Sequence, residues 1–99
     1  MIIVAGTIRV AAGKQSETTP HAQTMVAETR KEDGCIVYSF GWDVADPGLI
    51  RIYEEWESQE HLDAHMNTPH MANWRAALGE IGVIERNVKI LQGEQIGTV

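Results

Sequence analysis

Hydrophobic and polar residues alternate at the start of the chain, in the segment MIIVAGTIRV. The aliphatic side chains at positions 2, 4, 8 and 10 would share one face of an extended chain, and Ile3 and Ala5 would lie on the other. Because side chains alternate between the two faces of a strand, this pattern predicts a β-strand over residues 2–10 that is apolar on both faces.

Apolar residues then recur at spacings of three and four, which is typical of a helix with one buried stripe. The pattern predicts a helix from about residue 17 to residue 32, with a stripe made of Ala22, Met25, Val26 and Thr29. Pro20 leaves two starts open, because proline has no N–H. Thr19 as N-cap with Pro20 in the first helical position costs no hydrogen bond, whereas a start near Ser16 costs one.

Two alternating segments flank the tetrapeptide ADPG at residues 45–48, which is a turn by composition. They predict strands over residues 35–44 and 49–57 that pair as a hairpin. On the first strand, Cys35 would lie on one face, and the other face would carry Ile36, Tyr38, Phe40 and Trp42.

The second half of the chain predicts more helix and a last strand. Ser58 is a typical N-cap for SQEHLDAHM, NTP interrupts that helix, and HMANWRAAL continues to Gly79 or Gly82. A strand over 83–91 and a tail over about 92–99 follow. The order β-α-β-β-α-β predicts an α+β, ferredoxin-like fold with an antiparallel sheet, in a single domain over residues 1–99. Since the strands are apolar on both faces, we expect a homodimer packed sheet to sheet.

Composition narrows the range of partners. The formal net charge is −6, and the eight Lys and Arg residues are scattered, so we expect no nucleic-acid binding. The single cysteine, Cys35, cannot form an internal disulfide, which favours a cytoplasmic protein. The apolar start lacks a basic region and reaches Arg9 within ten residues, so we expect neither a signal peptide nor a membrane span.

Three of the four histidines fall between residues 53 and 71. His61 and His65 are four residues apart on a predicted helix and could both reach one metal ion, but no third ligand accompanies them, so we expect no metal. A second interpretation is that His65 is a half-buried packing residue, with His61 and His70 in solvent. The third is acid–base chemistry, which requires a partner for the imidazole.

The strand before this helix offers such a partner in Glu54, which lies in an apolar row between Ile52 and Trp56. A buried carboxylate is costly unless it is hydrogen-bonded or paired, and His65 returns over the sheet from the next helix. Such a pair would fix the imidazole tautomer and raise its basicity, which suits a general base. A purely structural Glu54–His65 pair that locks helix to strand is the alternative.

Aromatic residues surround this predicted pair. Tyr38, Phe40 and Trp42 share a strand face, and Trp56 and Trp74 flank the region of Glu54 and His65. They are either ordinary core residues or the walls of a flat apolar slot for a planar aromatic ligand.

Residues 34–71 resemble the antibiotic biosynthesis monooxygenase (ABM) domain family, which includes small quinol monooxygenases. The family pattern has Gly-Cys and a nearby aromatic residue, a short hairpin, Tyr/Phe-Glu-x-Trp, a helix with His, and a Thr/Ser-Pro-His-Phe/Met step. Here these are Gly34-Cys35, Tyr38, Tyr53-Glu54-Glu55-Trp56, His65 and Thr68-Pro69-His70-Met71.

The resemblance implies a dimeric α+β barrel and oxygenation of electron-rich phenols or quinols with O2, without a metal, haem or flavin cofactor. It implies that His65 is the base or oxyanion partner and Glu54 its orienter. The substrate would then be bound by Tyr38, Trp56, Trp74 and His70.

Two alternatives to this activity remain open. The first is a non-catalytic dimeric ligand-binding module of the same fold, because fold and motif do not fix a reaction. The second is a haem-degrading monooxygenase, which is less favoured because the first strand has Gly6-Thr7-Ile8 and no Asn where that branch has one.

Overall fold

The computed structural model describes residues 1–99 as four strands and three helices. The strands are β1 (Ile2–Val10), β2 (Cys35–Trp42), β3 (Leu49–Trp56) and β4 (Val83–Gln92). The helices are α1 (Gln15–Thr29), α2 (Gln59–Met66) and α3 (Pro69–Ile81). All strand pairs are antiparallel in the order β2-β3-β1-β4, which confirms the predicted ferredoxin-like fold.

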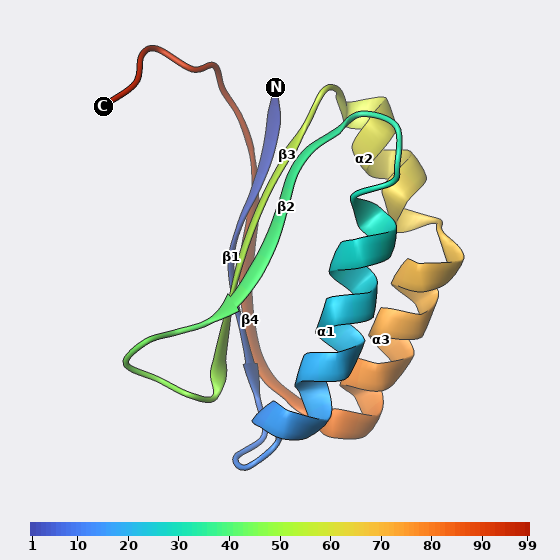
Figure 1. Cartoon of the computed structure of the whole chain (residues 1–99), viewed down its shortest axis with the longest axis vertical. Helices are drawn as coiled ribbons and strands as arrows, with labels where there is room; N and C mark the ends of the chain where they lie inside the picture. The colour runs from blue at the N-terminus through green and yellow to red at the C-terminus, as the bar shows by residue number, and fades with distance from the viewer.

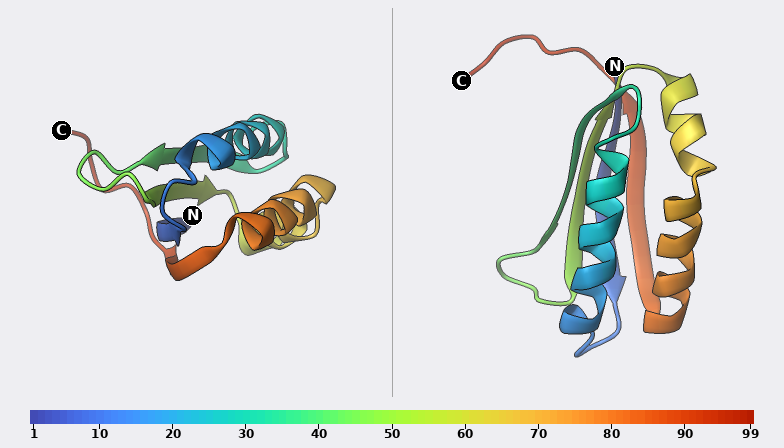
Figure 2. Two further views of the ribbon diagram at one scale, coloured as in Figure 1. Left: turned by 90° about the horizontal axis from the view of Figure 1, so that it is seen from below. Right: turned by 45° about the vertical axis from the view of Figure 1, so that its right-hand side comes forward.

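All three helices lie on one side of the sheet, and the other side carries none (Figures 1 and 2). The hydrophobic core fills the space between these two layers. It includes Val4, Ile8, Ile50 and Ile52 from the strands and Met25, Leu62, Trp74 and Leu78 from the helices. None of the helices combines the length and the hydrophobicity needed to cross a membrane.

Helix α1 takes the earlier of its two predicted starts, and Pro20 lies inside it. A proline in a helix interior costs about 3 kcal/mol. Contacts of the neighbouring threonines favour this start. Thr18 is completely buried, and its hydroxyl donates a hydrogen bond of 2.7 Å to the carbonyl of Lys14 one turn earlier. Nε1 of Trp42, on β2, donates one of 3.0 Å to Oγ1 of Thr19.

Helix α1 ends at Thr29 rather than at Glu32, so the predicted end was three residues too late. Residues 30–34 form a turn in which the backbone N–H of Glu32 donates to the carbonyl of Thr29 at 3.0 Å. Nε of Arg30 donates to the carbonyl of Tyr38 at 3.0 Å and ties the turn to β2. The side chain of Glu32 is thereby turned toward α2 instead of continuing the helix.

The prediction that Ile36 shares a face with Tyr38 was wrong. Cys35 pairs with Trp56 and Val37 pairs with Glu55, so Ile36 is an extra residue in a β-bulge. The bulge puts the half-buried Cys35 on the helix side of the sheet and leaves Ile36 50% exposed.

The predicted second helical region consists of two helices that are capped separately. Oγ of Ser58 accepts from the backbone N–H of His61 at 3.3 Å, which confirms the predicted cap of α2. Oγ1 of Thr68 accepts from the N–H of Met71 at 3.3 Å and donates to the carbonyl of His65 at 2.8 Å. This joint places the last turn of α2 beside the first turn of α3.

Replacing Gly34 with alanine is expected to destabilise the protein strongly. Gly34 has φ +77°, and an added Cβ would lie 2.2 Å from the ring of His61. Gly13 has the same φ, but a Cβ there would meet nothing within 4 Å. We therefore expect Gly13→Ala to cost about 1–2 kcal/mol and Gly34→Ala about 1–3 kcal/mol more, as measured by urea unfolding. Equal losses for the two variants would show that His61 moves aside without cost.

Candidate functional site

His65 lies at the centre of a polar and aromatic cluster beneath α2. Its side chain is completely buried. Its ring centroid is 4.7 Å from that of Trp56 and 5.3 Å from that of Tyr38. His65 therefore lies over the sheet as expected and is not the half-buried packing residue of the second interpretation.

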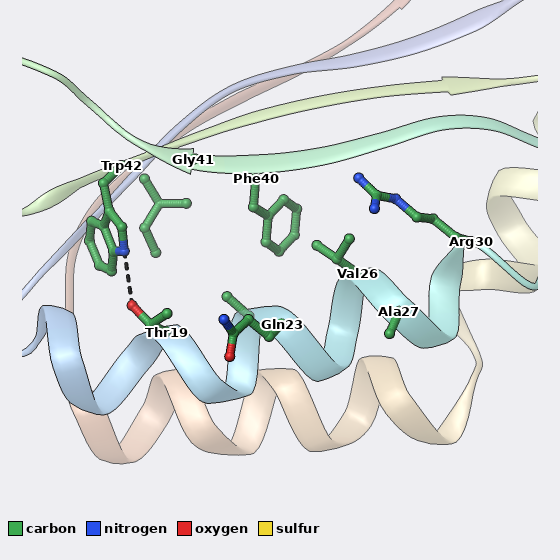
Figure 3. A pocket seen from close by; sticks show the side chains of 10 residues that line it. Thr19, Gln23, Val26, Ala27, Arg30, Phe40, Gly41 and Trp42 are labelled. Atoms are coloured by element: carbon green, nitrogen blue, oxygen red, sulfur yellow. Dashed lines mark hydrogen bonds between the residues drawn. The ribbon is translucent and has the colours of Figure 1, made fainter.

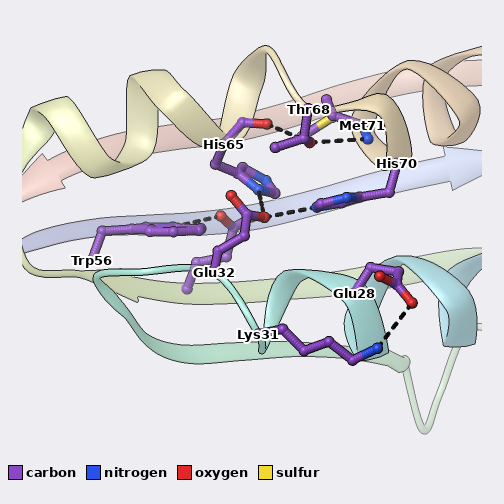
Figure 4. A network of polar contacts seen from close by, with 9 residues as sticks. Glu28, Lys31, Glu32, Trp56, His65, Thr68, His70 and Met71 are labelled. Carbon is purple, nitrogen blue, oxygen red and sulfur yellow. Dashed lines mark hydrogen bonds and ion pairs between the residues drawn. The ribbon is translucent and has the colours of Figure 1, made fainter.

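The partner of His65 is Glu32, which comes from the turn after α1. Oε2 of Glu32 lies 2.7 Å from Nδ1 of His65 and also 2.7 Å from Nε2 of His70 in the first turn of α3 (Figure 4). An ionised carboxylate can only accept hydrogen bonds, so both of these nitrogens carry a proton. One carboxylate thus fixes two imidazoles from two different helices.

The other ring nitrogen of His65 is unpaired. Nε2 is buried and has no hydrogen-bond partner. Burial lowers the pKa of His65, and the hydrogen bond to Glu32 opposes this effect only in part. With Nδ1 protonated toward Glu32, a neutral His65 presents a free lone pair at Nε2, which is the form required of a general base.

The predicted Glu54–His65 pair was wrong in its partner. Oε1 of Glu54 accepts a hydrogen bond of 3.0 Å from Nε1 of Trp56, and His65 is held by Glu32 instead. Glu54 is 6% exposed, as its apolar row predicted. Burial raises the pKa of Glu54 to about 7, the Trp56 hydrogen bond opposes this rise, and the charge of Glu32 adds to it.

Glu32 is the residue that sequence reasoning missed. It belongs to the charged segment ETRKED at the predicted end of the first helix, where acidic side chains usually lie in solvent. Its contacts with His65 and His70 span 33 and 38 residues of sequence, so no local spacing in the sequence predicts them. The only local sign is Gly34, because a glycine just after a predicted helix favours a turn close to Glu32.

A cavity of about 350 Å³ lies between the sheet and the helices α2 and α3. Most of its wall is apolar, and the polar or charged side chains in the wall are Glu54, His65, Arg75 and Arg86, besides the hydroxyl of Tyr38 and the indole of Trp74. His65 and Glu54 therefore meet at the cavity, although they are not paired.

Two of the four predicted substrate-binding residues, Tyr38 and Trp74, line this cavity. The other two do not. Trp56 is completely buried against the ring of His65, and His70 is bonded to Glu32 and half-buried, so it is neither in solvent nor in the cavity wall. Trp56 is linked to the cavity through its hydrogen bond to Glu54. His70 is linked to it through Glu32, which also holds His65.

A second hollow lies between α1 and the edge strand β2 (Figure 3). Its volume is about 400 Å³, and its wall includes Val26, Arg30, Phe40 and the Thr19–Trp42 hydrogen bond. Phe40 also lines the first cavity. No histidine or carboxylate lines this hollow, so the first cavity is the one that offers acid–base chemistry.

The side chains that could hold a metal ion are Glu32, His65 and His70, whose ligand atoms lie within 4.8 Å of one another. His61, which was considered above as a ligand beside His65, is not part of this group, and its Nδ1 lies 2.7 Å from Oγ of Ser58. Metal binding at the triad would require both imidazoles to lose the protons that they share with Glu32. As it stands, the triad is arranged to orient His65.

We expect Glu54 to give the protein a stability that falls as the pH rises. Its folded pKa of about 7 lies above its ordinary value of 4.5, so the folded state holds the proton more tightly than the unfolded state. Stability from this group is present below pH 4.5 and is lost on going up to about pH 7, an effect of the order of 3 kcal/mol.

The measurement is chemical unfolding from pH 5 to pH 8 of the wild type and of Glu54→Gln. Subtracting one unfolding free energy from the other removes the contribution of His65. Because its folded pKa is lowered, His65 makes the protein less stable as the pH falls through 6.5. Glu55→Gln, one position along on the other sheet face, is expected to keep the wild-type slope. An unchanged slope in Glu54→Gln would contradict the assignment.

The chain is similar in sequence to known proteins. The family model described as "Antibiotic biosynthesis monooxygenase" matches residues 1–77. The Escherichia coli K12 protein named "Probable quinol monooxygenase YgiN" is 38% identical over 76 residues, which cover 69% of this chain and 72% of that protein.

Other matches are shorter in sequence. An uncharacterized Synechocystis protein, sll1783, is 38% identical over 69 residues, covering 70% of this chain and 47% of that protein. Mycobacterium tuberculosis Rv0793 is 40% identical over 57 residues, covering 58% of this chain and 55% of its own length. The chain thus spans about half the length of these two relatives. The solved structure of Rv0793 superposes with a TM-score of 0.86 at 26% identity, covering 98% of each chain.

Proposed function

The chain belongs to the antibiotic biosynthesis monooxygenase family, and we propose from this premise that it oxidises a small hydroxylated aromatic compound or quinol with O2. The observation that carries the proposal is the buried, unpaired Nε2 of His65, a residue that lines a cavity with aromatic side chains in its wall. A phenol hydroxyl entering that cavity would find there a proton acceptor with no competing partner.

In the proposed reaction, Nε2 of His65 takes the phenol proton, and the Glu32 carboxylate stabilises the imidazolium that forms. The phenolate then passes an electron to O2, and the two radicals combine at a ring carbon. One oxygen atom stays on the ring and the other leaves as water, so the electrons come from the substrate and no outside reductant is needed. The proposal involves no metal, haem or flavin.

Glu54 has a different place in this scheme from the one that the sequence suggested. Glu32 orients His65, so Glu54 is free to act on the substrate. With a pKa of about 7, its carboxyl group exchanges a proton readily near neutral pH. We propose that Glu54 holds the second proton released from the quinol, while Trp56 keeps the carboxyl group in place.

The direct test is O2 uptake after anaerobic mixing with a panel of quinols and hydroxylated aromatics. The proposed function predicts uptake above the rate of spontaneous oxidation, with one oxygen atom from labelled O2 in the product. A non-catalytic binding module of the same fold would bind these compounds and leave the rate unchanged. That result across the panel would refute the proposal.

The uncovered face of the sheet supports a homodimer as part of the proposal. It carries Ile3, Tyr53 and Leu91, and the last two are 41% and 48% exposed. Burying such a face against a second copy is favourable because it removes apolar surface from water. We expect sedimentation to give twice the chain mass of 11.0 kDa. We expect Leu91→Arg to shift the protein toward a monomer, and a monomeric wild type at micromolar concentration would contradict this arrangement.

The remaining parts of the proposal concern location and partners. The single thiol of Cys35 supports a reducing compartment such as the cytoplasm. The scattered cations support a small-molecule substrate rather than a nucleic acid.

A further inference from the structure

Two arginines in the cavity wall have no partner of their own. Arg75 comes from α3 and Arg86 from β4, and both are exposed. Neither guanidinium makes a hydrogen bond or an ion pair within the chain. Guanidinium groups are strong, fixed donors to carboxylates and other oxyanions, so an unused pair at a cavity is a candidate anion site.

Most of the other cations of the chain have a partner, so a cation without one is unusual in this protein. Of the eight Lys and Arg residues, five interact with a carboxylate or a carbonyl: Arg9, Lys14, Arg30, Lys31 and Arg51. Only Arg75, Arg86 and Lys89 are free. The chain has fourteen acidic residues, yet two of its three free cations face one cavity.

The backbone explains why both guanidiniums reach the cavity. Arg86 pairs with Ile8 across β1 and β4, so it lies on the helix side of the sheet, whereas Lys89 pairs with Ala5 and lies on the other side. Arg75 directly follows the buried Trp74 on α3. Burial is the main cause of the lowered pKa of His65, and the charge of Arg75 lowers it further, so this guanidinium is within Coulombic reach of the imidazole.

The cavity contains little negative charge to neutralise these arginines. Its only carboxyl group is Glu54, which is largely buried. The pKa of Glu54 is raised to about 7, so this group is only partly ionised at neutral pH. His65 is fully buried at one part of the wall, whereas the arginines are exposed. A ligand that reaches His65 with one end would therefore present its other end to the arginines.

We infer that the substrate is a hydroxylated aromatic compound with an anionic substituent, such as a carboxylate, which Arg75 and Arg86 bind while the phenol hydroxyl faces His65. The orientation of the reacting end rests on the proposed function. The anion site rests only on the two free guanidiniums and the charge of the cavity.

The test compares 2,5-dihydroxybenzoate with its uncharged methyl ester. Binding is measured anaerobically by titration calorimetry, and turnover is measured separately by O2 uptake. We expect the acid to bind about tenfold more tightly than the ester, with a preference that weakens as salt is added. Arg75→Gln and Arg86→Gln should each remove most of that preference and leave ester binding unchanged. Lys89→Gln makes the same change in net charge on the other sheet face and should change neither affinity.

The two readouts separate failure of the inference from failure of the proposed function. Equal binding of acid and ester, or a preference that survives both arginine substitutions, would overturn the inference, and O2 uptake with either compound would still support the monooxygenase. Arginine-dependent binding of the acid without O2 uptake would support the anion site and count against the proposed reaction.

Discussion

Replacing His65 with asparagine is expected to lower kcat for quinol oxidation by about 10²–10⁴-fold, the usual contribution of a general base. The asparagine amide can still donate to Glu32 in place of Nδ1, so the orienting contact survives. It has no nitrogen lone pair to take the phenol proton at the position of Nε2. The variant therefore tests proton transfer rather than the architecture of the turn, and it is assayed by O2 uptake under saturating substrate.

The matched control is His21→Asn, because His21 is an exposed residue of α1 far from the cluster in sequence, and its side chain makes no hydrogen bond or ion pair. It should keep the wild-type rate. The wild-type rate should also fall at acid pH as His65 becomes protonated, at a pH below its ordinary pKa of 6.5 because burial lowers it. A folded His65→Asn protein with the wild-type rate would refute the role of this residue as the base.

Replacing Glu32 with glutamine is expected to lower kcat by about 10²-fold, with a smaller change in KM. A neutral amide cannot stabilise the imidazolium, and its NH2 group can face Nδ1 of His65. His65 would then shift its proton to Nε2, the atom that must accept the phenol proton. Loss of the carboxylate also removes the partner of His70, so we expect a fall in unfolding free energy of about 1–3 kcal/mol.

Glu28→Gln is the matched control for this substitution. Glu28 lies four residues earlier, points away from the histidines in Figure 4, and pairs only with Lys31, whose side chain is 73% exposed. An exposed pair of this kind contributes little to stability, so activity and stability should stay at the wild-type level. NMR titration of His65 supplies a second readout, because the loss of the Glu32 charge should lower its pKa further. An unaltered titration in Glu32→Gln would show that the two side chains do not interact in solution.

Local pattern was sufficient for most of the secondary structure. Alternation and helical spacing are properties of neighbouring residues, so β1, the β2–β3 hairpin and the cap at Ser58 could be predicted from short segments. The end of α3 was narrowed to two glycines, of which the structure uses Gly82. Where the prediction failed, a distant contact decided the outcome. Trp42 holds Thr19 and so stabilises a helix start that leaves Pro20 in the interior. The bulge at Ile36 depends on pairing with β3.

The sequence by itself determined that His65 and Glu54 would be buried, because each occupies an apolar position of its own helix or strand. Only the tertiary structure decided how they are paired. Glu32 reaches His65 across 33 residues because α1 ends early and its turn folds toward α2, while Trp56 takes the carboxyl group of Glu54. Side-chain pairing depends on the separation of atoms in space, and a turn can bring any exposed carboxylate to a buried imidazole without leaving a periodic trace in the sequence.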